Sequence, residues 1–314
     1  MRKEITVSKE YDNVRIDRFV NKYYPTIPKG AIQKMLRKGD IRLNGKKTTA
    51  DTRITEGDIV RVFTIDEEKT ISVRQDVGDI EVIYEDESLI CMMKPAGLVT
   101  HPDGNHAESL SERLIKYLYE GKESGVYTAS PLNRLDYNTS GIVLAAKTPS
   151  FARTLAELIA ENKVIKEYVA LVEGSFTDRK KVTTYAVKNE KENMMILSDT
   201  ETEGSVKMVS IFEGIETVGG YSLVKCRLIT GKTHQIRSQL LYLGHPIIGD
   251  IKYCSDSSRK TTKELSVKRQ MLHCYRVTIP TDFDTITVTS SPAADMKKLL
   301  RKLGFRNYDN LQEL

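Results

Sequence analysis

The sequence lacks any hydrophobic run long enough to cross a membrane. None of its apolar stretches approaches the ~18 consecutive apolar residues of a transmembrane helix. Charged and apolar side chains alternate over residues 1–19, where a signal peptide would need an uninterrupted apolar core. We therefore expect a cytoplasmic protein without a membrane partner.

Cysteine is scarce as well. The four cysteines stand at positions 91, 226, 254 and 274, with neither the CxxC pairs of a zinc site nor the spacing of a disulfide framework. The five histidines show no HExxH pattern. We expect reduced thiols and no bound metal.

The motifs of common cofactor-dependent enzymes are missing too. The sequence contains neither the GxGxxG of dinucleotide-binding folds nor the GxSxG of α/β-hydrolases. Gly231-Lys232-Thr233 looks like the end of a P-loop, but Cys226 occupies a position where that motif needs glycine. Dinucleotide-dependent redox enzymes, α/β-hydrolases and P-loop proteins therefore lose their main support in the sequence.

What the sequence does have is positive charge gathered in one segment. The 314 residues are 39% hydrophobic and 29% charged, with a formal net charge of +5, which is typical of a folded globular chain of roughly two domains. Residues 12–63 hold twelve basic and six acidic residues, so this segment alone carries +6 and the remainder is nearly neutral. Such a cluster is the electrostatic signature of phosphate-backbone binding.

The pattern within this segment predicts a compact helix–helix–hairpin domain over residues 12–65. Apolar residues recur at helical spacing from Ile16 to Tyr23, and a second helix begins after Pro28 and stops at Gly39. The dipeptide Asn44-Gly45 is a strong signal for a hairpin turn. A merely solvated basic surface is the alternative to an RNA-binding face. The candidate RNA contacts are the basic residues Arg15, Arg18, Lys29, Lys34, Arg37, Lys38 and Arg42.

Polar residues 66–78 predict a linker, and the pattern beyond it is mixed. Strand-like runs occur at 80–84, 89–93, 141–146, 168–172, 221–228 and 271–279. Helical periodicity occurs at 109–119, after Pro149, at 234–243 and at 292–303. Because strands outnumber helices and several are joined by short turns, we expect residues 79–314 to form an α+β domain with a mainly antiparallel mixed sheet and flanking helices.

Two polar clusters in this domain could carry chemistry. The first, residues 133–141, leads directly into an apolar strand that would hold Asp136 firmly as a nucleophile or a base. An Asx turn before the strand is the structural alternative. The second cluster places Lys232, His234 and Arg237 near the start of a helix, where they could meet an anion. Ordinary helix capping with solvated charge is the alternative there.

Both parts of the chain resemble known families. The run P-K-G-A-I-Q-K-M-L-R-K-G-D-I-R-L-N-G-K at 28–46 resembles an S4 domain, a small RNA-binding module. The run N-R-L-D-Y-N-T-S-G at 133–141 resembles the H-R-L-D-x-x-T-S-G signature of the RluA family of RNA pseudouridine synthases. Further blocks follow the family's order; they begin at Lys94, Lys166, Thr230, Gly244 and Leu272.

The resemblance implies an enzyme that isomerises uridine in RNA to pseudouridine, without a cofactor, in a cleft across an antiparallel sheet. It makes Asp136 the catalytic aspartate, places Tyr168 against the target base and pairs Arg237 with Asp136. Arg134 would fill the gap left when the base swings out of the RNA, a step that enzymes acting on bases commonly need. Lys232 and His234 would add local RNA contacts.

Three positions depart from the usual family pattern, namely Asn133, Lys232 and Gln239. Family members that carry an S4 domain mostly act on large-subunit (23S) ribosomal RNA, so we expect that substrate. We also expect no DNA partner and a monomer. The alternatives are a synthase for transfer RNA, a non-catalytic S4-type RNA-binding protein, and a nucleoside hydrolase with Asp136 as nucleophile.

Overall fold

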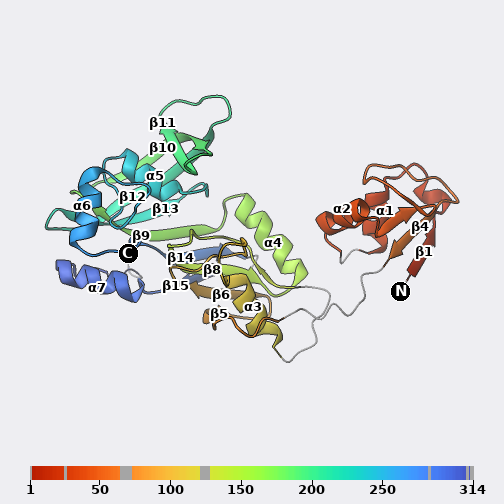
Figure 1. Cartoon of the computed structure of the whole chain (residues 1–314), viewed down its shortest axis with the longest axis horizontal. Coiled ribbons are helices and arrows are strands. Elements are labelled where there is room, and N and C mark those ends of the chain that lie inside the picture. The colour runs from red at the N-terminus through yellow and green to blue at the C-terminus, as the bar shows by residue number, and fades with distance from the viewer. Residues whose placement is uncertain are drawn as a thin grey trace. The chain divides into compact units, whose positions relative to one another are not determined.

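The computed structural model describes residues 2–24, 27–63, 73–120, 128–281, 284–308 and 311. The chain divides into two compact units, Met1–Ser72 with Gly121–Thr128, and Val73–Glu120 with Ala129–Leu314. Both appear in Figure 1. Residues 66–72 of the predicted linker lie outside the described residues. In the described ranges, no helix combines the length and apolar character needed to span a bilayer.

The first unit packs two helices against a four-stranded sheet with the order β1-β4-β2-β3. Strand β1 lies before residue 12 and pairs antiparallel with β4, so the sheet extends beyond the predicted helix–hairpin segment. The elements are β1 (Arg2–Thr6), α1 (Ile16–Tyr23), α2 (Lys29–Lys38), β2 (Ile41–Leu43), β3 (Lys46–Lys47) and β4 (Ile59–Phe63), with a short 3-10 helix at Lys9–Tyr11.

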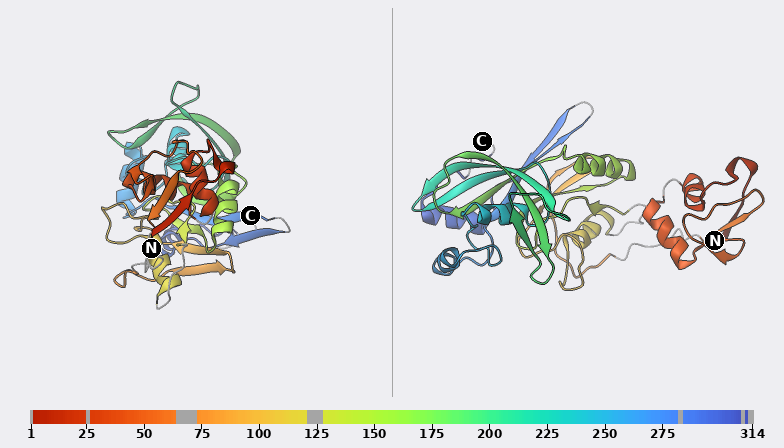
Figure 2. Two further views of the ribbon diagram at one scale, coloured as in Figure 1. Left: turned by 90° about the vertical axis from the view of Figure 1, so that its right-hand side faces the viewer. Right: turned by 90° about the horizontal axis from the view of Figure 1, so that it is seen from above.

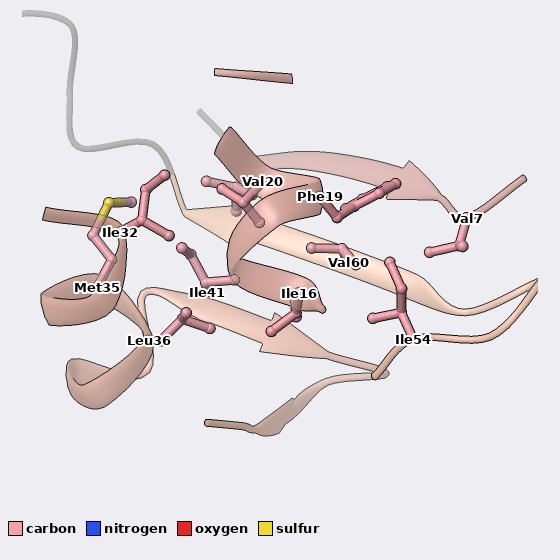
Figure 3. Packing of buried hydrophobic residues seen from close by; sticks show 11 residues of the cluster. Val7, Ile16, Phe19, Val20, Ile32, Met35, Leu36, Ile41, Ile54 and Val60 are labelled. Carbon is pink, nitrogen blue, oxygen red and sulfur yellow. The ribbon is translucent and has the colours of Figure 1, made fainter. Parts of the chain in front are cut away.

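The apolar stripes predicted for the two helices form the core of this unit (Figure 3). Phe19 of α1 and Leu36 of α2 are each 1% exposed and belong to the same buried cluster as the sheet residue Val60. Gly39 ends α2 in the left-handed conformation, with φ +86°, which only glycine adopts at little cost. Because the apolar side chains face inward, the basic residues of α2 remain on the solvent side.

The second unit contains an 11-stranded sheet in the described part of the chain. Its main path is β11-β10-β12-β13-β9-β14-β8-β6-β5; β15 pairs with β14, and β7 with β8. All of these pairs are antiparallel except β8–β14. The strands are β5 (Glu81–Glu85), β6 (Leu89–Lys94), β7 (Ser130–Pro131), β8 (Ser140–Ala146), β9 (Ile165–Glu173), β10 (Arg179–Asn189), β11 (Met194–Ser198), β12 (Val206–Val218), β13 (Tyr221–Leu228), β14 (Leu272–Pro280) and β15 (Thr285–Thr289).

Helices flank this sheet, and the predicted α+β class is confirmed. The helices are α3 (Leu110–Tyr119), α4 (Pro149–Ala160), α5 (Gln235–Tyr242), α6 (Asp256–Glu264) and α7 (Ala294–Leu303). Helix α4 packs against β8, and α5 against β11. The views in Figure 2 also show β15 and the end of β14 that pairs with it (blue) projecting from the sheet.

The structure adds elements that the sequence did not predict. Strands β10, β11 and β12 fill residues 179–218, and the polar helix α6 follows the turn after Asp250. These strands extend the sheet beyond β13 and supply the surface on which α5 packs. Helix α5 carries Arg237, so the unpredicted strands support one wall of the site described next.

Candidate active site

Asp136 lies in the loop between β7 and β8, where the backbone is fixed by a close approach of two strands. Gly141, at φ +128°, pairs with Cys274 of the parallel strand β14. A Cβ on Gly141 would lie 2.3 Å from the carbonyl oxygen of Cys274, a separation that no side chain can occupy. The loop therefore enters β8 at a point set by glycine, five residues after Asp136.

Three side chains from other segments hold this loop. Thr100 exchanges hydrogen bonds of 3.3 Å with the backbone of Leu135. Lys94 donates from Nζ to the carbonyl oxygen of Tyr137 at 3.1 Å, and Arg269 donates to that of Asn138 at 3.3 Å. The carboxylate of Asp136 thus stands on a loop that is fixed on both of its sides.

Asp136 and Arg237 meet across 101 residues of sequence. Nη1 of Arg237 donates to Oδ2 of Asp136 at 2.8 Å. The same guanidinium donates from Nε and Nη2 to the two carboxylate oxygens of Asp250, at 2.6 and 2.9 Å. Burial alone would lower the pKa of Arg237, but the bonds and charges of Asp250 and Asp136 raise it above its ordinary value. Arg237 is therefore a permanent cation held between two carboxylates.

The second oxygen of Asp136 is open. Both the Arg237 bond and a His234 contact of 3.9 Å involve Oδ2. Among the described residues, no group donates a hydrogen bond to Oδ1. The side chain of Asp136 is 24% exposed and lines the neighbouring cavity, so its carboxylate is accessible to a molecule bound there.

His234 precedes α5 in the left-handed conformation, with φ +54°. Its Nδ1 lies 3.0 Å from the hydroxyl of Tyr253, which accepts a hydrogen bond from the backbone N–H of Met195. Burial lowers the pKa of His234 despite the opposing charge of Asp136. At neutral pH this histidine is therefore an uncharged hydrogen-bonding group beside the Asp136–Arg237 pair.

Tyr168 of β9 is 6% exposed and lines the same cavity as Asp136 and Arg237. Burial, and then the neighbouring Cys274, raise the pKa of its hydroxyl well above the ordinary value, so the phenol stays protonated. An aromatic ring in this position offers a flat apolar surface next to a carboxylate.

These residues enclose a cavity of about 260 Å³. Of the predicted site residues, Arg134, Asp136, Tyr168, Lys232, His234 and Arg237 all line it. The basic residues predicted on the first unit belong to a separate unit of the chain, and their relation to this cavity remains a prediction. Nowhere in the described ranges do three His, Cys, Asp or Glu side chains gather as a metal site would require.

Comparison with known proteins identifies the family of this chain. A family model described as RNA pseudouridylate synthase matches residues 88–242, and the S4 domain model matches residues 14–60. The Ribosomal large subunit pseudouridine synthase C of Pasteurella multocida is 32% identical over 313 residues, covering 96% of this chain and 94% of that protein. The chain belongs to the RNA pseudouridine synthase family.

Two further comparisons fit this synthase. The mitochondrial tRNA pseudouridine(32) synthase of Saccharomyces cerevisiae is 30% identical over 226 residues, covering 71% of the chain but 47% of that protein. The solved structure titled Human RNA Pseudouridylate Synthase Domain Containing 4 shares the fold, with a TM-score of 0.59, 20% identity, and coverage of 71% of this chain and 92% of that one. The predicted RluA-family membership and S4 domain are confirmed, and the protein is an isomerase.

The contacts of two residues that depart from the family pattern, Gln239 and Asn133, differ in place. Gln239 of the synthase is fully buried; its amide donates to Thr184 and accepts from Ser210, so it ties α5 to β10 and β12. Asn133 is 8% exposed, and its Oδ1 accepts a hydrogen bond of 2.7 Å from the backbone N–H of Leu144. Gln239 thus packs inside the synthase, whereas Asn133 lines the cavity.

Sequence reasoning assigned no role to several groups at this site. Lys94, Lys166 and Asp250 stood in the blocks that carried the family resemblance, but only their contacts reveal what they do. Lys94 is fully buried, and burial lowers its pKa to about 7. Arg269 lay outside those blocks, and no sequence signal pointed to its contact with the Asp136 loop.

Proposed function

We propose that Asp136 is the catalytic aspartate of this synthase and that Arg237 and Tyr168 complete its reaction site. The observation that carries the proposal is the 2.8 Å contact of Arg237 with Oδ2 of Asp136, which leaves Oδ1 without a donor among the described residues, on a side chain that lines the cavity. In the reaction the N1–C1′ bond of uridine breaks and a C1′–C5 bond forms, while C5 loses a proton and N1 gains one. Reactant and product have the same atoms, and neither is oxidised.

Asp136 would act at the ribose. Its free Oδ1 is the group available to attack C1′ or to accept a proton from C2′, and either step gives an activated sugar to which the uracil can reattach. Arg237 fixes the carboxylate and is itself fixed by Asp250. This preorganisation means that little rearrangement is needed when charge develops.

Tyr168 and Arg134 would handle the base. Extruding a base from its stack costs a few kcal/mol, and stacking on an aromatic ring returns about 1–3 kcal/mol. Tyr168 lines the cavity and can supply such a ring, while the exposed Arg134 stands at the same cavity and can enter the gap left in the RNA.

We further propose that the substrate is large-subunit ribosomal RNA. The support is the extent of the match: the relative from Pasteurella multocida, whose name states that substrate, aligns over 94% of its length, against 47% for the yeast transfer-RNA enzyme. The S4 unit would hold the RNA through the exposed basic residues of α2, with Arg15, Arg18 and Arg42 on neighbouring elements.

The test of the chemistry is Asp136→Asn in the full chain. The exchange keeps the shape of the side chain but removes the charge, so we expect RNA affinity to change little and pseudouridine formation to be lost. The matched control is Asp178→Asn, because Asp178 is 66% exposed and pairs only with Lys180 among the described residues. Unchanged product formation by Asp136→Asn would refute the assignment, and release of free uracil by the unaltered protein would favour the hydrolase.

The substrate is tested by mapping. Carbodiimide-block primer extension across ribosomal and transfer RNA, from cells with and without the gene, locates each missing pseudouridine. We expect a loss in large-subunit ribosomal RNA; a loss confined to transfer RNA would overturn the substrate proposal and leave the chemistry standing.

A further inference from the structure

The cavity of the synthase carries more positive charge than its chemistry requires. Asp136 is the only carboxylate among the residues that line it, and that carboxylate is bound to Arg237. Three further basic side chains line the cavity, namely Arg134, Lys166 and Lys232. The cavity is thus built to attract a negatively charged group in addition to a neutral base.

Lys166 is the least expected of these cations. It lies on β9 two residues before Tyr168, and alternate strand residues share a face, so both side chains reach the cavity. Its Nζ lies against the loop before α5, since a Cβ on Gly231 would be 3.4 Å from it. The ammonium is therefore held within the wall of the cavity.

No carboxylate of the described residues pairs with Lys166. The neighbouring Glu167 points to the opposite face of the sheet, where it pairs with Lys225 at 3.5 Å and Arg276 at 3.4 Å. Among the described residues, Lys166 itself makes no hydrogen bond or ion pair, whereas Arg237 in the same cavity is held by two carboxylates. Burial lowers the pKa of Lys166, as it does for an ammonium without a counterion.

We infer that Lys166 binds a phosphodiester group of the RNA strand next to the target uridine. This inference rests on the proposed function. An ammonium in a desolvated wall is costly unless a charge compensates it. A phosphate oxygen supplies that charge and forms a charge-assisted hydrogen bond, whereas the carbonyl oxygens of uracil are neutral. Lysine suits this task, because it binds phosphate as a point charge without demanding a fixed fork geometry.

The experiment measures binding of a fluorescein-labelled undecamer of uridine to the full chain at several salt concentrations. Each phosphate contact on a single strand adds about 0.7 to the slope of log K against log salt. We expect Lys166→Met to weaken binding at low salt and to reduce this slope by about 0.7, and Lys166→Arg to retain it. Lys207→Met is the matched control, because Lys207 is exposed on β12 and does not line the cavity.

An unchanged slope in Lys166→Met would overturn the inference, even if isomerisation fell, because Lys166 would then contact the base or only stabilise the fold. Absence of binding by the unaltered protein would overturn it as well. The outcome is separable from that of the proposed function. If Lys166→Met reduces the slope but the unaltered protein does not isomerise ribosomal RNA, the phosphate contact stands and the proposed function is refuted. If the slope is unchanged but the unaltered protein isomerises ribosomal RNA, the proposed function stands and the phosphate contact is refuted.

Discussion

Asp250 offers the sharpest test of how the site is held together. Its side chain is fully buried, and that of Arg237 is 9% exposed. The two form a bidentate pair, and Oδ1 of Asp250 also accepts from the backbone N–H groups of Lys252 and Tyr253, both at 2.9 Å. Replacing Asp250 by alanine therefore removes the main partner of a buried guanidinium together with the acceptor of a turn.

The expected cost follows from this burial. Breaking a buried ion pair by removing one partner costs about 3–5 kcal/mol, because the remaining charge is left uncompensated. Asp136 keeps one bond to Arg237, which limits the loss of stability. The two backbone N–H groups left without an acceptor increase that loss. We expect Asp250→Ala to lower the free energy of unfolding of the catalytic unit by about 4 kcal/mol. An exposed pair is worth less than about 1 kcal/mol, which is the value we expect for Asp178→Ala.

The assay is pulsed hydrogen exchange along a urea titration, read in peptides from β8 and α5, so that the S4 unit does not enter the result. A second variant, Asp250→Asn, retains an oxygen acceptor but not the charge. We expect Asp250→Asn to lower the free energy of unfolding less than Asp250→Ala does. It should still reduce turnover, because Arg237 then holds Asp136 less firmly. If Asp250→Ala costs no more than Asp178→Ala, the buried pair does not stabilise the site and the reasoning fails.

Two further predictions concern the support of the Asp136 loop. Gly141→Ala should prevent folding of the catalytic unit, because its Cβ would meet the backbone of Cys274 at 2.3–2.5 Å; limited proteolysis checks this, and a protease-resistant variant with full activity would contradict it. Lys94, with a pKa lowered to about 7, is neutral in the folded chain above pH 7 but protonated in the unfolded chain up to about pH 10. The unfolded state then binds more protons, so this lysine makes stability rise with pH by up to about 1.4 kcal/mol per unit between pH 7 and 10. Lys94→Met should abolish that slope in urea unfolding, and an equal slope in both proteins would refute the lowered pKa.

Local sequence signals located many elements but not all. Helix α2 begins at Lys29 and ends at Lys38, as Pro28 and Gly39 indicated. The unpredicted strand β10 begins with three exposed basic residues, and only Thr184 and Ala186 of its eleven residues are buried. Helix α6 buries only Ser258 and Thr262. Elements of this kind have no apolar stripe, because neighbours elsewhere in the chain stabilise them, so periodicity cannot reveal them.

The sequence by itself determined the family and the α+β class, since those depend on residue identities in ordered blocks, and it named six of the residues that line the cavity. Only the tertiary structure decided which groups meet. Arg237 reaches Asp136 across 101 residues, and Asp250 and Lys94 fix that arrangement from two other segments. The structure also separates Glu167 from Lys166, although they are neighbours in sequence, because consecutive strand residues face opposite sides of the sheet. The excess of basic groups in the cavity is therefore a property of the fold and cannot be derived from the composition of the chain.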